Sequence, residues 1–174
     1  MSASLDTRNL GFLLHEVLDV AALTRRPRYA GQTRADYDAV IASAKSIADR
    51  ALAPHFAAGD ADEPQLQDGV VRHVLGTQEA WSAIADAGFL RAHCDETEGG
   101  LQLPEPVLRA ASAHFHAANG PSHWYSFLTI GVLNLLRAFG SAEQKRLFLP
   151  ALMEGRCAGT MALTEPAQGS ALAD

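Results

Sequence analysis

Hydrophobic positions recur with a helical period along most of the chain. In residues 9–23 the apolar side chains lie three or four apart, on one face of a helix: Leu10, Leu13, Leu14, Val17, Leu18 and Ala21. Pro27 and Gly31 interrupt this pattern, and Thr33 is a suitable N-cap for a second helix, with Asp36 near its positive end. The apolar stripe of this second helix comprises Tyr37, Val40, Ile41, Ala44, Ile47, Ala48, Ala51 and Leu52. We therefore expect two amphipathic helices in the first third of the chain, the second weakening at Pro54 and Gly59.

The middle of the chain alternates between helical patterns and turn signals. Residues 59–63 predict an acidic turn, and residues 64–75 have no clear pattern. Residues 78–87 predict a helix ended by Gly88, and 89–95 an irregular or short extended piece. Residues 98–100, Glu-Gly-Gly, predict a loop, because glycine adopts backbone angles that other residues resist. Two further helices are expected over 104–119 and 124–139, separated by a turn at Gly120-Pro121.

The last helix and the segment after it have contrasting patterns. Ser141 and Gln144 form a capping box that opens a helix to about Glu154, with Gly155 just beyond its end. Residues 157–163 are small, apolar and partly β-branched, which predicts a strand that ends at Thr164-Glu165-Pro166. A single strand cannot satisfy its backbone groups. We therefore expect the chain to be part of a longer protein.

Composition and charge are typical of a soluble globular protein and exclude several functions. Hydrophobic residues make up 48% of the 174 residues and charged residues 20%. The net charge of −6 argues against a nucleic-acid surface, which needs clustered basic residues. No apolar stretch is long enough to span a membrane, and the N-terminus lacks the pattern of a signal peptide, so we expect a cytoplasmic location. Two cysteines without metal-ligand spacing predict reduced thiols.

The histidines give no metal-site pattern. His114 and His116 are expected on opposite sides of one helix, and no third ligand is suitably spaced. The other histidines are scattered along the chain, so ordinary surface or half-buried positions are the favoured interpretation for them: His15, His55, His73, His93 and His123. We predict no metal ligands and assign no catalytic residue.

Three motifs resemble the acyl-CoA dehydrogenase family. Residues 159–170, GTMALTEPAQGS, are similar to the family's first signature, in which an apolar strand is followed by Thr-Glu-Pro, a spacer and Gly-Ser-Asp. Residues 139–155, FGSAEQKRLFLPALMEG, resemble the last helix of the family's N-terminal domain, and residues 88–100 its glycine-rich loop. The resemblance covers residues 34–174. Taken alone, Thr-Glu-Pro could simply end a strand, but the upstream helices in register favour the family.

The resemblance implies a fold and a division of the chain. The family has an all-α helical N-terminal domain, a middle β-domain and a C-terminal helical bundle. We therefore expect an all-α helical domain that ends in the first strand of a β-domain otherwise missing from this chain. The expected parts are an N-terminal extension helix in residues 1–32, the helical domain in 33–156, and the start of the truncated β-domain in 157–174.

The resemblance also implies an activity. Family members use FAD to introduce a 2,3-double bond into an acyl-CoA thioester. They usually form homo-oligomers, and an electron-transferring flavoprotein is the expected electron acceptor. Their catalytic base is a glutamate in the C-terminal bundle, beyond residue 174. We therefore expect the 174-residue chain alone neither to retain FAD nor to turn over acyl-CoA.

The matching positions give candidate site residues. By resemblance, the cofactor-binding residues are Met161, Leu163, Thr164, Gly169 and Ser170. A threonine hydroxyl and adjacent backbone amides can supply hydrogen bonds to a reduced flavin, and Gly169 allows close approach. Ala171 stands where the family normally has aspartate.

Ser170 is also a candidate substrate contact, together with Leu128 and Gly131 on a helix that lines the acyl pocket in the family. Plain core packing explains the apolar stripe of that helix equally well. The alternative for the whole chain is a stand-alone, non-catalytic helical module for interaction or dimerisation. The Thr-Glu-Pro and Gly-Ser residues argue against it, because such a module does not need them.

Overall fold

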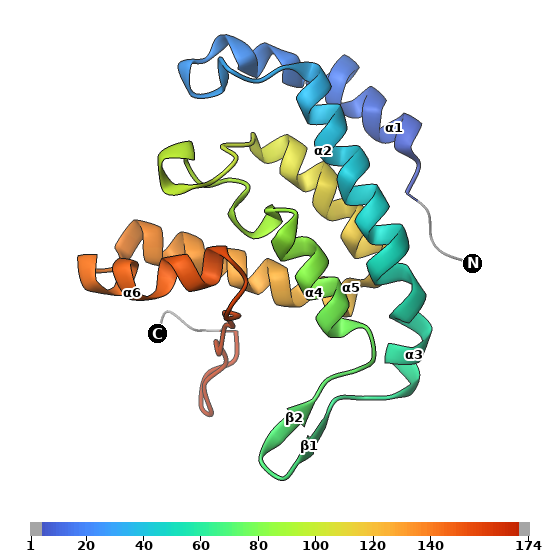
Figure 1. Ribbon diagram of the computed structural model, residues 1–174, viewed down its shortest axis with the longest axis vertical. Helices are drawn as coiled ribbons and strands as arrows, with labels where there is room; N and C mark the ends of the chain where they lie inside the picture. The colour runs from blue at the N-terminus through green and yellow to red at the C-terminus, as the bar shows by residue number, and fades with distance from the viewer. Residues whose placement is uncertain (1–4, 171–174) are drawn as a thin grey trace.

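The computed structural model describes residues 5–170 as a group of packed helices with one small hairpin at the edge (Figure 1). Its α-helices are α1 Thr7–Phe12, α2 Arg34–Ile47, α3 Phe56–Ala61, α4 Thr77–Asp86, α5 Glu105–Phe139 and α6 Ala142–Met153. The strands are β1 Gln65–Gln67 and β2 Val70–Arg72, paired antiparallel. The prediction of a mostly helical domain is confirmed.

The second predicted helix begins where its capping residues place it. The backbone N–H of Thr33 donates to Asp36 Oδ2 at 2.7 Å, and the N–H of Asp36 donates to Thr33 Oγ1 at 3.2 Å. These two bonds satisfy amides that have no partner inside the helix. The helix α2 continues into a π-helical turn, Ala48–Leu52, before Pro54. Tyr37, Ala44 and Leu52 of its apolar stripe are fully buried.

The longest helix, α5, consists of two helices joined at a kink, as the Gly120-Pro121 turn predicts. Asn119 leaves the helical region with φ −161° and ψ 88°. Its side chain donates to the carbonyl of Leu52 at 3.2 Å and accepts from the N–H of Ser122 at 3.1 Å. Asn119 therefore caps the second half and ties the kink to the end of the turn after α2.

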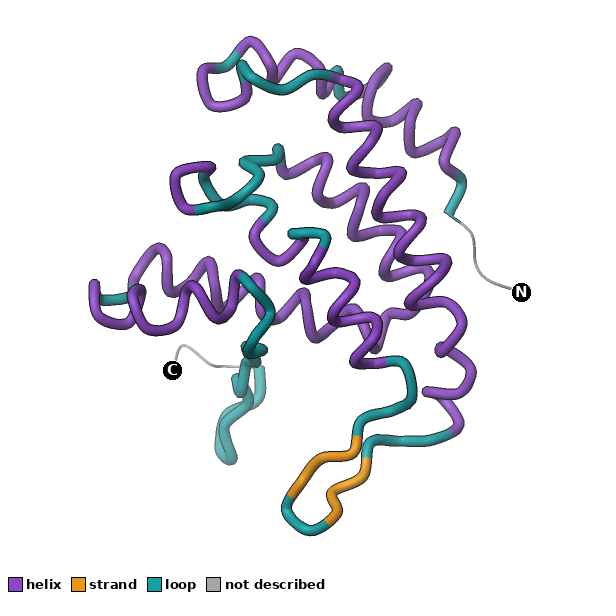
Figure 2. Tube along the Cα trace, in the orientation of Figure 1, coloured by secondary structure: helices purple, strands orange, loops and turns teal. Residues whose placement is uncertain are grey.

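The core is largest where α2, α4 and the first half of α5 meet. Figure 2 shows these helices beside one another, and the second half of α5 running beside α6. The largest cluster of buried side chains includes Ala44, Leu52, Ile84, Leu90 and Phe115. A second cluster joins the N-terminal helices to α2 and α5, and a third lies between α5 and α6. This packing holds both halves of α5 in place around the kink.

The N-terminal segment is less regular than the predicted helix over 9–23. After α1 the chain makes a π-helical turn, Leu13–Val17, and then 3-10 turns over Val20–Arg25. Asp19 breaks the α-helix because its backbone is left-handed, with φ 43°. Of the predicted apolar face, Leu14 is buried against Tyr37 and Val107, whereas Leu13, Val17 and Leu18 are exposed, so that face is used only in part.

The hairpin in residues 64–75 is a feature that the sequence pattern did not predict. Asp68 and Gly69 both have positive φ, 51° and 78°, as a two-residue hairpin turn requires. The three residues of each strand are exposed. The hairpin therefore lacks the buried face that produces a detectable alternating pattern.

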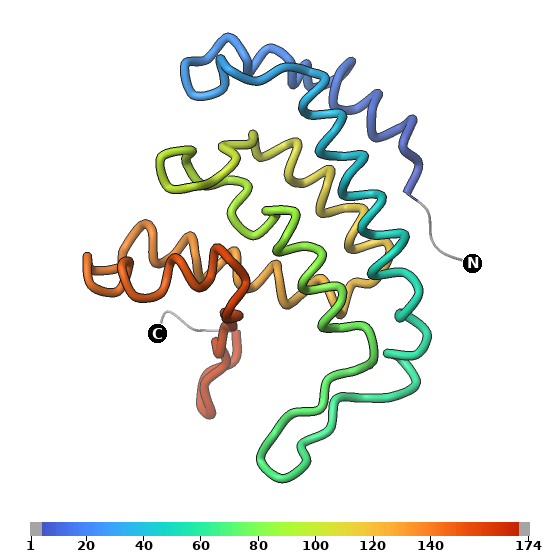
Figure 3. The backbone as a smooth tube through the Cα atoms, in the orientation of Figure 1, coloured from blue at the N-terminus to red at the C-terminus, as the bar shows by residue number. Residues whose placement is uncertain are grey.

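Residues 157–163, which we predicted as a strand, form no strand in the structure (Figure 3, orange to red). Among the described residues no neighbouring strand is available to pair with them. Instead the N–H of Gly159 donates to Thr129 Oγ1 at 2.9 Å, and a side chain at this position would collide with Val132. The segment is therefore docked on the second half of α5. The division at residues 32 and 156 stays a prediction.

Candidate functional site

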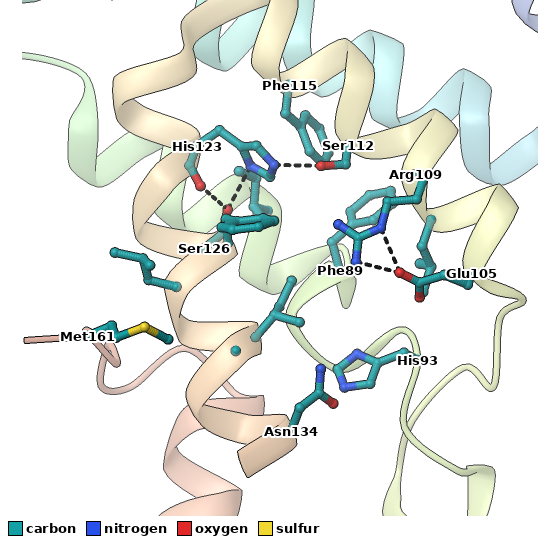
Figure 4. A pocket seen from close by; sticks show the side chains of 16 residues that line it. Phe89, His93, Glu105, Arg109, Ser112, Phe115, His123, Ser126, Asn134 and Met161 are labelled. Carbon is teal, nitrogen blue, oxygen red and sulfur yellow. Dashed lines mark hydrogen bonds and ion pairs between the residues drawn. The ribbon is translucent and has the colours of Figure 1, made fainter. Parts of the chain in front are cut away.

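A cavity of about 160 Å³ lies between α4, the loop after it and both halves of α5 (Figure 4). The kink at Asn119 opens the two halves of α5, so that side chains of both face the same space. Its lining residues are Ile84, Phe89, His93, Glu105, Leu108, Arg109, Ser112, Phe115, His123, Ser126, Phe127, Leu128, Ile130, Gly131, Asn134 and Met161. The cavity thus brings together residues from α4 to the C-terminal segment.

Aromatic and aliphatic side chains form most of the wall. The rings of Phe89 and Phe115 meet edge to face with centroids 5.1 Å apart, a favourable aromatic arrangement. Phe127 also lines the cavity, and its ring centroid lies 5.9 Å from the guanidinium carbon of Arg109. Gly131 leaves the helix surface open, because nothing lies within 4 Å of where its Cβ would be. These features suit an apolar ligand.

A buried polar cluster joins the two halves of α5 at one side of the cavity (Figure 4). The ring of His123 contacts Ser112 Oγ through Nε2 and Ser126 Oγ through Nδ1, each at 2.8 Å. The hydroxyl of Ser126 also donates to the carbonyl of His123 at 2.8 Å. Because that hydroxyl has one proton, Ser126 Oγ accepts from Nδ1–H, and Nε2 accepts from the Ser112 hydroxyl. The arrangement defines one neutral tautomer of His123.

The surroundings of His123 keep its ring neutral. Burial, followed by the nearby His116 and Arg109, lowers the pKa of His123 to about 3. The rings of His116 and His123 meet edge to face with centroids 4.4 Å apart. His116 Nδ1 lies 3.2 Å from the carbonyl of Ser112, to which it can only donate. His123 therefore acts as a hydrogen-bonding group rather than as a proton donor near neutral pH.

Two further polar pairs lie at the edge of the cavity. Arg109 Nε donates to Glu105 Oε1 at 2.6 Å, and a second guanidinium nitrogen contacts the same carboxylate, so this cation is neutralised locally. His93 faces the side-chain amide of Asn134, and burial lowers the pKa of His93. The cavity is therefore bordered at this edge by an internally paired Arg109–Glu105 ion pair and by the His93–Asn134 pair.

The loop that carries His93 is held by the N-terminal segment. Arg28 pairs with Asp95 at 2.5 Å and donates to the carbonyl of His93 at 3.3 Å. Gln32 donates to the carbonyl of Gln102 at 2.9 Å. From the other side, Arg137 of α5 contacts Glu98 at 2.5 Å.

The loop is also closed tightly on itself. Gly100 lies against the backbone of Cys94, where no Cβ would fit. The Cys94 thiol is fully buried, and burial raises its pKa to about 11. It is therefore a packing residue rather than a nucleophile.

The predicted site residues fall into two groups. Leu128, Gly131 and Met161 line the cavity together. Leu163, Thr164, Gly169 and Ser170 are exposed in the C-terminal segment and are not among the lining residues. Glu165 and Gln168 pair through two backbone hydrogen bonds of 2.9 and 3.2 Å, which fold the Glu-Pro-Ala-Gln stretch into a turn. The cofactor and substrate roles of all these residues stay predictions.

The donor types in the C-terminal segment fit a flavin ring. Met161 and Leu163 are 55% and 54% exposed, and the hydroxyl-bearing Thr164 follows directly. Apolar side chains beside a hydroxyl and free backbone amides match a flat ring with polar edges. Gly169 has open space around its Cβ position, so a phosphate or ring could approach its backbone.

Ser112 was not singled out by the sequence analysis. His93 and His123 were interpreted as ordinary surface or half-buried histidines, yet both line the cavity and His123 is only 3% exposed. Residues 112, 116, 123 and 126 come from two helices, and their helical spacing is broken by the Gly120-Pro121 turn. The helical period within either helix therefore could not indicate that these four residues lie together. His114 and His116 do lie on different sides of α5, as predicted, since His114 is buried and His116 is exposed.

Within residues 5–170 no three His, Cys, Asp or Glu side chains are grouped to hold a metal ion. None of the helices in that range combines the length and the apolar character needed to cross a membrane.

Comparison with known proteins identifies relatives. Residues 34–156 match the sequence profile described as the N-terminal domain of acyl-CoA dehydrogenases. A 3-methylmercaptopropionyl-CoA dehydrogenase of Ruegeria pomeroyi is 34% identical over 70% of this chain and 21% of its own length. A broad-specificity linear acyl-CoA dehydrogenase of Mycobacterium tuberculosis is 28% identical over 95% of this chain and 27% of its own length. A mitochondrial long-chain specific acyl-CoA dehydrogenase of Sus scrofa is 29% identical over 55% of the chain and 22% of its own length. The chain thus spans about a quarter or less of the relatives it matches.

Proposed function

The chain belongs to the acyl-CoA dehydrogenase family, and on that premise we propose that it forms the helical part of a flavin-dependent enzyme that introduces a 2,3-double bond into an acyl-CoA thioester. In this reaction the acyl group loses a proton from its α-carbon and a hydride from its β-carbon. FAD, when bound, accepts the hydride. The proposal gives residues 5–170 binding roles and assigns proton abstraction to none of them.

The observation that carries the proposal is the shared cavity. Leu128 and Gly131, the candidate acyl contacts, line the same space as Met161, the candidate flavin neighbour. An acyl chain held against α5 would then place its reactive carbons near the segment that holds the flavin. Phe89, Phe115 and Phe127 supply an apolar wall that excludes water from the acyl chain.

Thr164 and Ser170 complete the proposed cofactor site. Their hydroxyls and the backbone around Gly169 would donate hydrogen bonds to the flavin ring and to phosphate oxygens. We extend the proposal to the family's partners, an electron-transferring flavoprotein that takes up the electrons and further copies of the same protein. The test uses the purified flavin-dependent enzyme of which this chain forms the helical part. Loss of its flavin absorbance band in the variant Thr164→Val would support these assignments, and an unchanged band would argue against Thr164.

The acyl assignment is tested by filling the cavity from Gly131. In the variant Gly131→Leu we expect butanoyl-CoA to bind nearly as in the parent protein and hexanoyl-CoA to bind about tenfold more weakly. The loss corresponds to about two methylene groups that can no longer be buried. Helix propensity favours leucine over glycine at this helical position, so the variant should fold. Isothermal titration calorimetry with the acyl-CoA series gives the dissociation constants.

The matched control is Gly11→Leu in α1, where a Cβ also meets nothing within 4 Å and the cavity is distant. Equal affinity losses in both variants, or no dependence on acyl length in Gly131→Leu, would exclude the cavity as the acyl site.

A non-catalytic interaction module is the second candidate, supported by exposed apolar side chains on α5 and α6. Leu135, Phe139 and Phe148 are 59%, 82% and 51% exposed. Sedimentation velocity of the parent and of Phe139→Ser separates the two functions. A module would lose self-association in the variant and show no affinity for acyl-CoA, whereas the enzyme part would bind acyl-CoA in both.

A further inference from the structure

The cavity contains hydrogen-bonding groups with which a plain hydrocarbon acyl chain cannot interact. Ser112, His123 and Ser126 all line a space that is otherwise formed mainly by aromatic and aliphatic side chains. His123 and Ser126 are only 3% and 1% exposed, and their bonds with Ser112 are short, at 2.8 Å. A saturated chain would gain nothing from these groups.

The direction of each bond shows what the cluster can offer to a ligand. The Ser126 proton is donated to the carbonyl of His123, and the Nδ1 proton of His123 is donated to Ser126 Oγ. The Ser112 proton is donated to His123 Nε2. Every proton of the cluster is therefore used, while Ser112 Oγ keeps lone pairs.

One of these lone pairs is open to a ligand. The nearest other donor to Ser112 Oγ is His116 Nδ1 at 3.4 Å, which is long for a hydrogen bond. The same nitrogen lies closer, at 3.2 Å, to the Ser112 carbonyl, which takes its proton. Ser112 is half-buried and faces the cavity (Figure 4), so its free oxygen lone pair presents an acceptor there.

We propose that this cavity selects an acyl group that carries a hydroxyl, which donates its hydrogen bond to Ser112 Oγ. The inference rests on the proposed function, since it names the substrate class of the same site. A carboxylate does not fit this position, because it has no proton to donate and Arg109 is already paired with Glu105.

The size of the cavity limits the acyl group to a short one. A cavity of about 150 Å³ engineered in another protein holds benzene, with about six carbon atoms. The present cavity of about 160 Å³ is of the same size. A hydroxyl at the end of a four- to six-carbon acyl group, roughly the size of benzene, could therefore reach the cluster.

The test compares matched pairs of acyl-CoA thioesters on the purified protein by isothermal titration calorimetry. The probes are butanoyl-, pentanoyl- and hexanoyl-CoA and their counterparts with a terminal hydroxyl. For at least one chain length we expect the hydroxylated thioester to bind about fivefold more tightly than the plain one, as one neutral hydrogen bond allows. Equal or weaker binding of the hydroxylated probe at every length would overturn the inference and leave the proposed function intact. Failure of all six thioesters to bind would overturn the proposed function itself.

Variants of Ser112 then test whether the preference for the hydroxylated thioester depends on this residue. Ser112→Val removes the acceptor and covers His123 Nε2, so the ratio of the two affinities should fall to about one. Ser112→Thr keeps the hydroxyl and should keep the ratio, which guards against a general loss of structure. The control Ser43→Val changes an exposed serine of α2 far from the cavity and should leave the ratio unchanged. A cluster that only holds the two halves of α5 together would give the same ratio in all four proteins and would refute the role of Ser112.

Discussion

At the scale of single residues, His123 makes the stability of the molecule depend on pH. Its folded pKa is about 3, below the ordinary value of 6.5, so the unfolded chain takes up the proton first as the pH falls. Stability from this residue is thus complete above pH 6.5 and is lost as the pH decreases toward 3. At pH 5 the expected loss is about 2 kcal/mol.

Urea unfolding at pH 7 and pH 5 of the parent protein and of His123→Gln measures this effect. The parent should lose about 2 kcal/mol more than the variant between the two pH values. His73→Gln, which changes an exposed ring on the loop after the hairpin, should behave like the parent. A parent and a His123→Gln variant with parallel pH dependence would show that His123 is not protonated on unfolding.

The sequence could predict single residues where one helix or one motif contains the whole signal. Thr33 and Ser141 cap helices as expected, because a capping box spans four consecutive residues. Leu128 and Gly131 were predicted from the resemblance of their helix to one that lines the acyl pocket in the family, and they do line the cavity. The cluster around His123 was missed, because its partners come from both sides of a kink and meet only after folding.

At the scale of elements, the kink in α5 shapes the cavity, and Asn119 holds the kink. Its side-chain amide donates a hydrogen bond to the Leu52 carbonyl and accepts one from the backbone N–H of Ser122. In Asn119→Ala both lose their partner in a buried place, which should cost about 1–3 kcal/mol of unfolding free energy. Urea unfolding gives the value, and Asn9→Ala, an exposed position on α1, is the matched control. Similar unfolding free energies for both variants would mean that water or another group replaces the Asn119 bonds.

Element types were predictable where one face is buried and not where burial is absent. The stripe in α2 and the helix over 78–87 appear as expected, since both present apolar faces to the main core. The strands β1 and β2 have only exposed residues, so no alternating pattern predicted the hairpin, and its turn at Asp68-Gly69 was missed as well. Residues 157–163 have strand-like composition, yet strand formation also needs a pairing edge, which composition cannot supply.

At the scale of the whole molecule, the N-terminal segment and the cavity are physically connected. Residues 26–33 lie outside the part of the chain that matches the family domain, yet Arg28 and Gln32 bind the loop that carries His93. Among the described residues, this loop has Arg137 as its ion-pair partner from the opposite side. The N-terminal segment therefore acts as a clamp that sets the position of His93 at the edge of the cavity.

Weakening the contacts between the N-terminal segment and this loop should change both the mobility of the loop and ligand binding in the cavity. In Arg28→Gln the ion pair with Asp95 is lost, so we expect faster amide hydrogen exchange over residues 93–102 by about tenfold, with little change in α2. Acyl-CoA affinity should fall by a few-fold, because His93 is no longer held beside Asn134. The matched control is Arg25→Gln, whose side chain is 77% exposed and 3.9 Å from Asp19. Faster exchange in 93–102 with unchanged acyl-CoA affinity would show that the loop contacts do not affect ligand binding. Unchanged exchange would show that Arg137 and the tight packing of Gly100 hold the loop without Arg28.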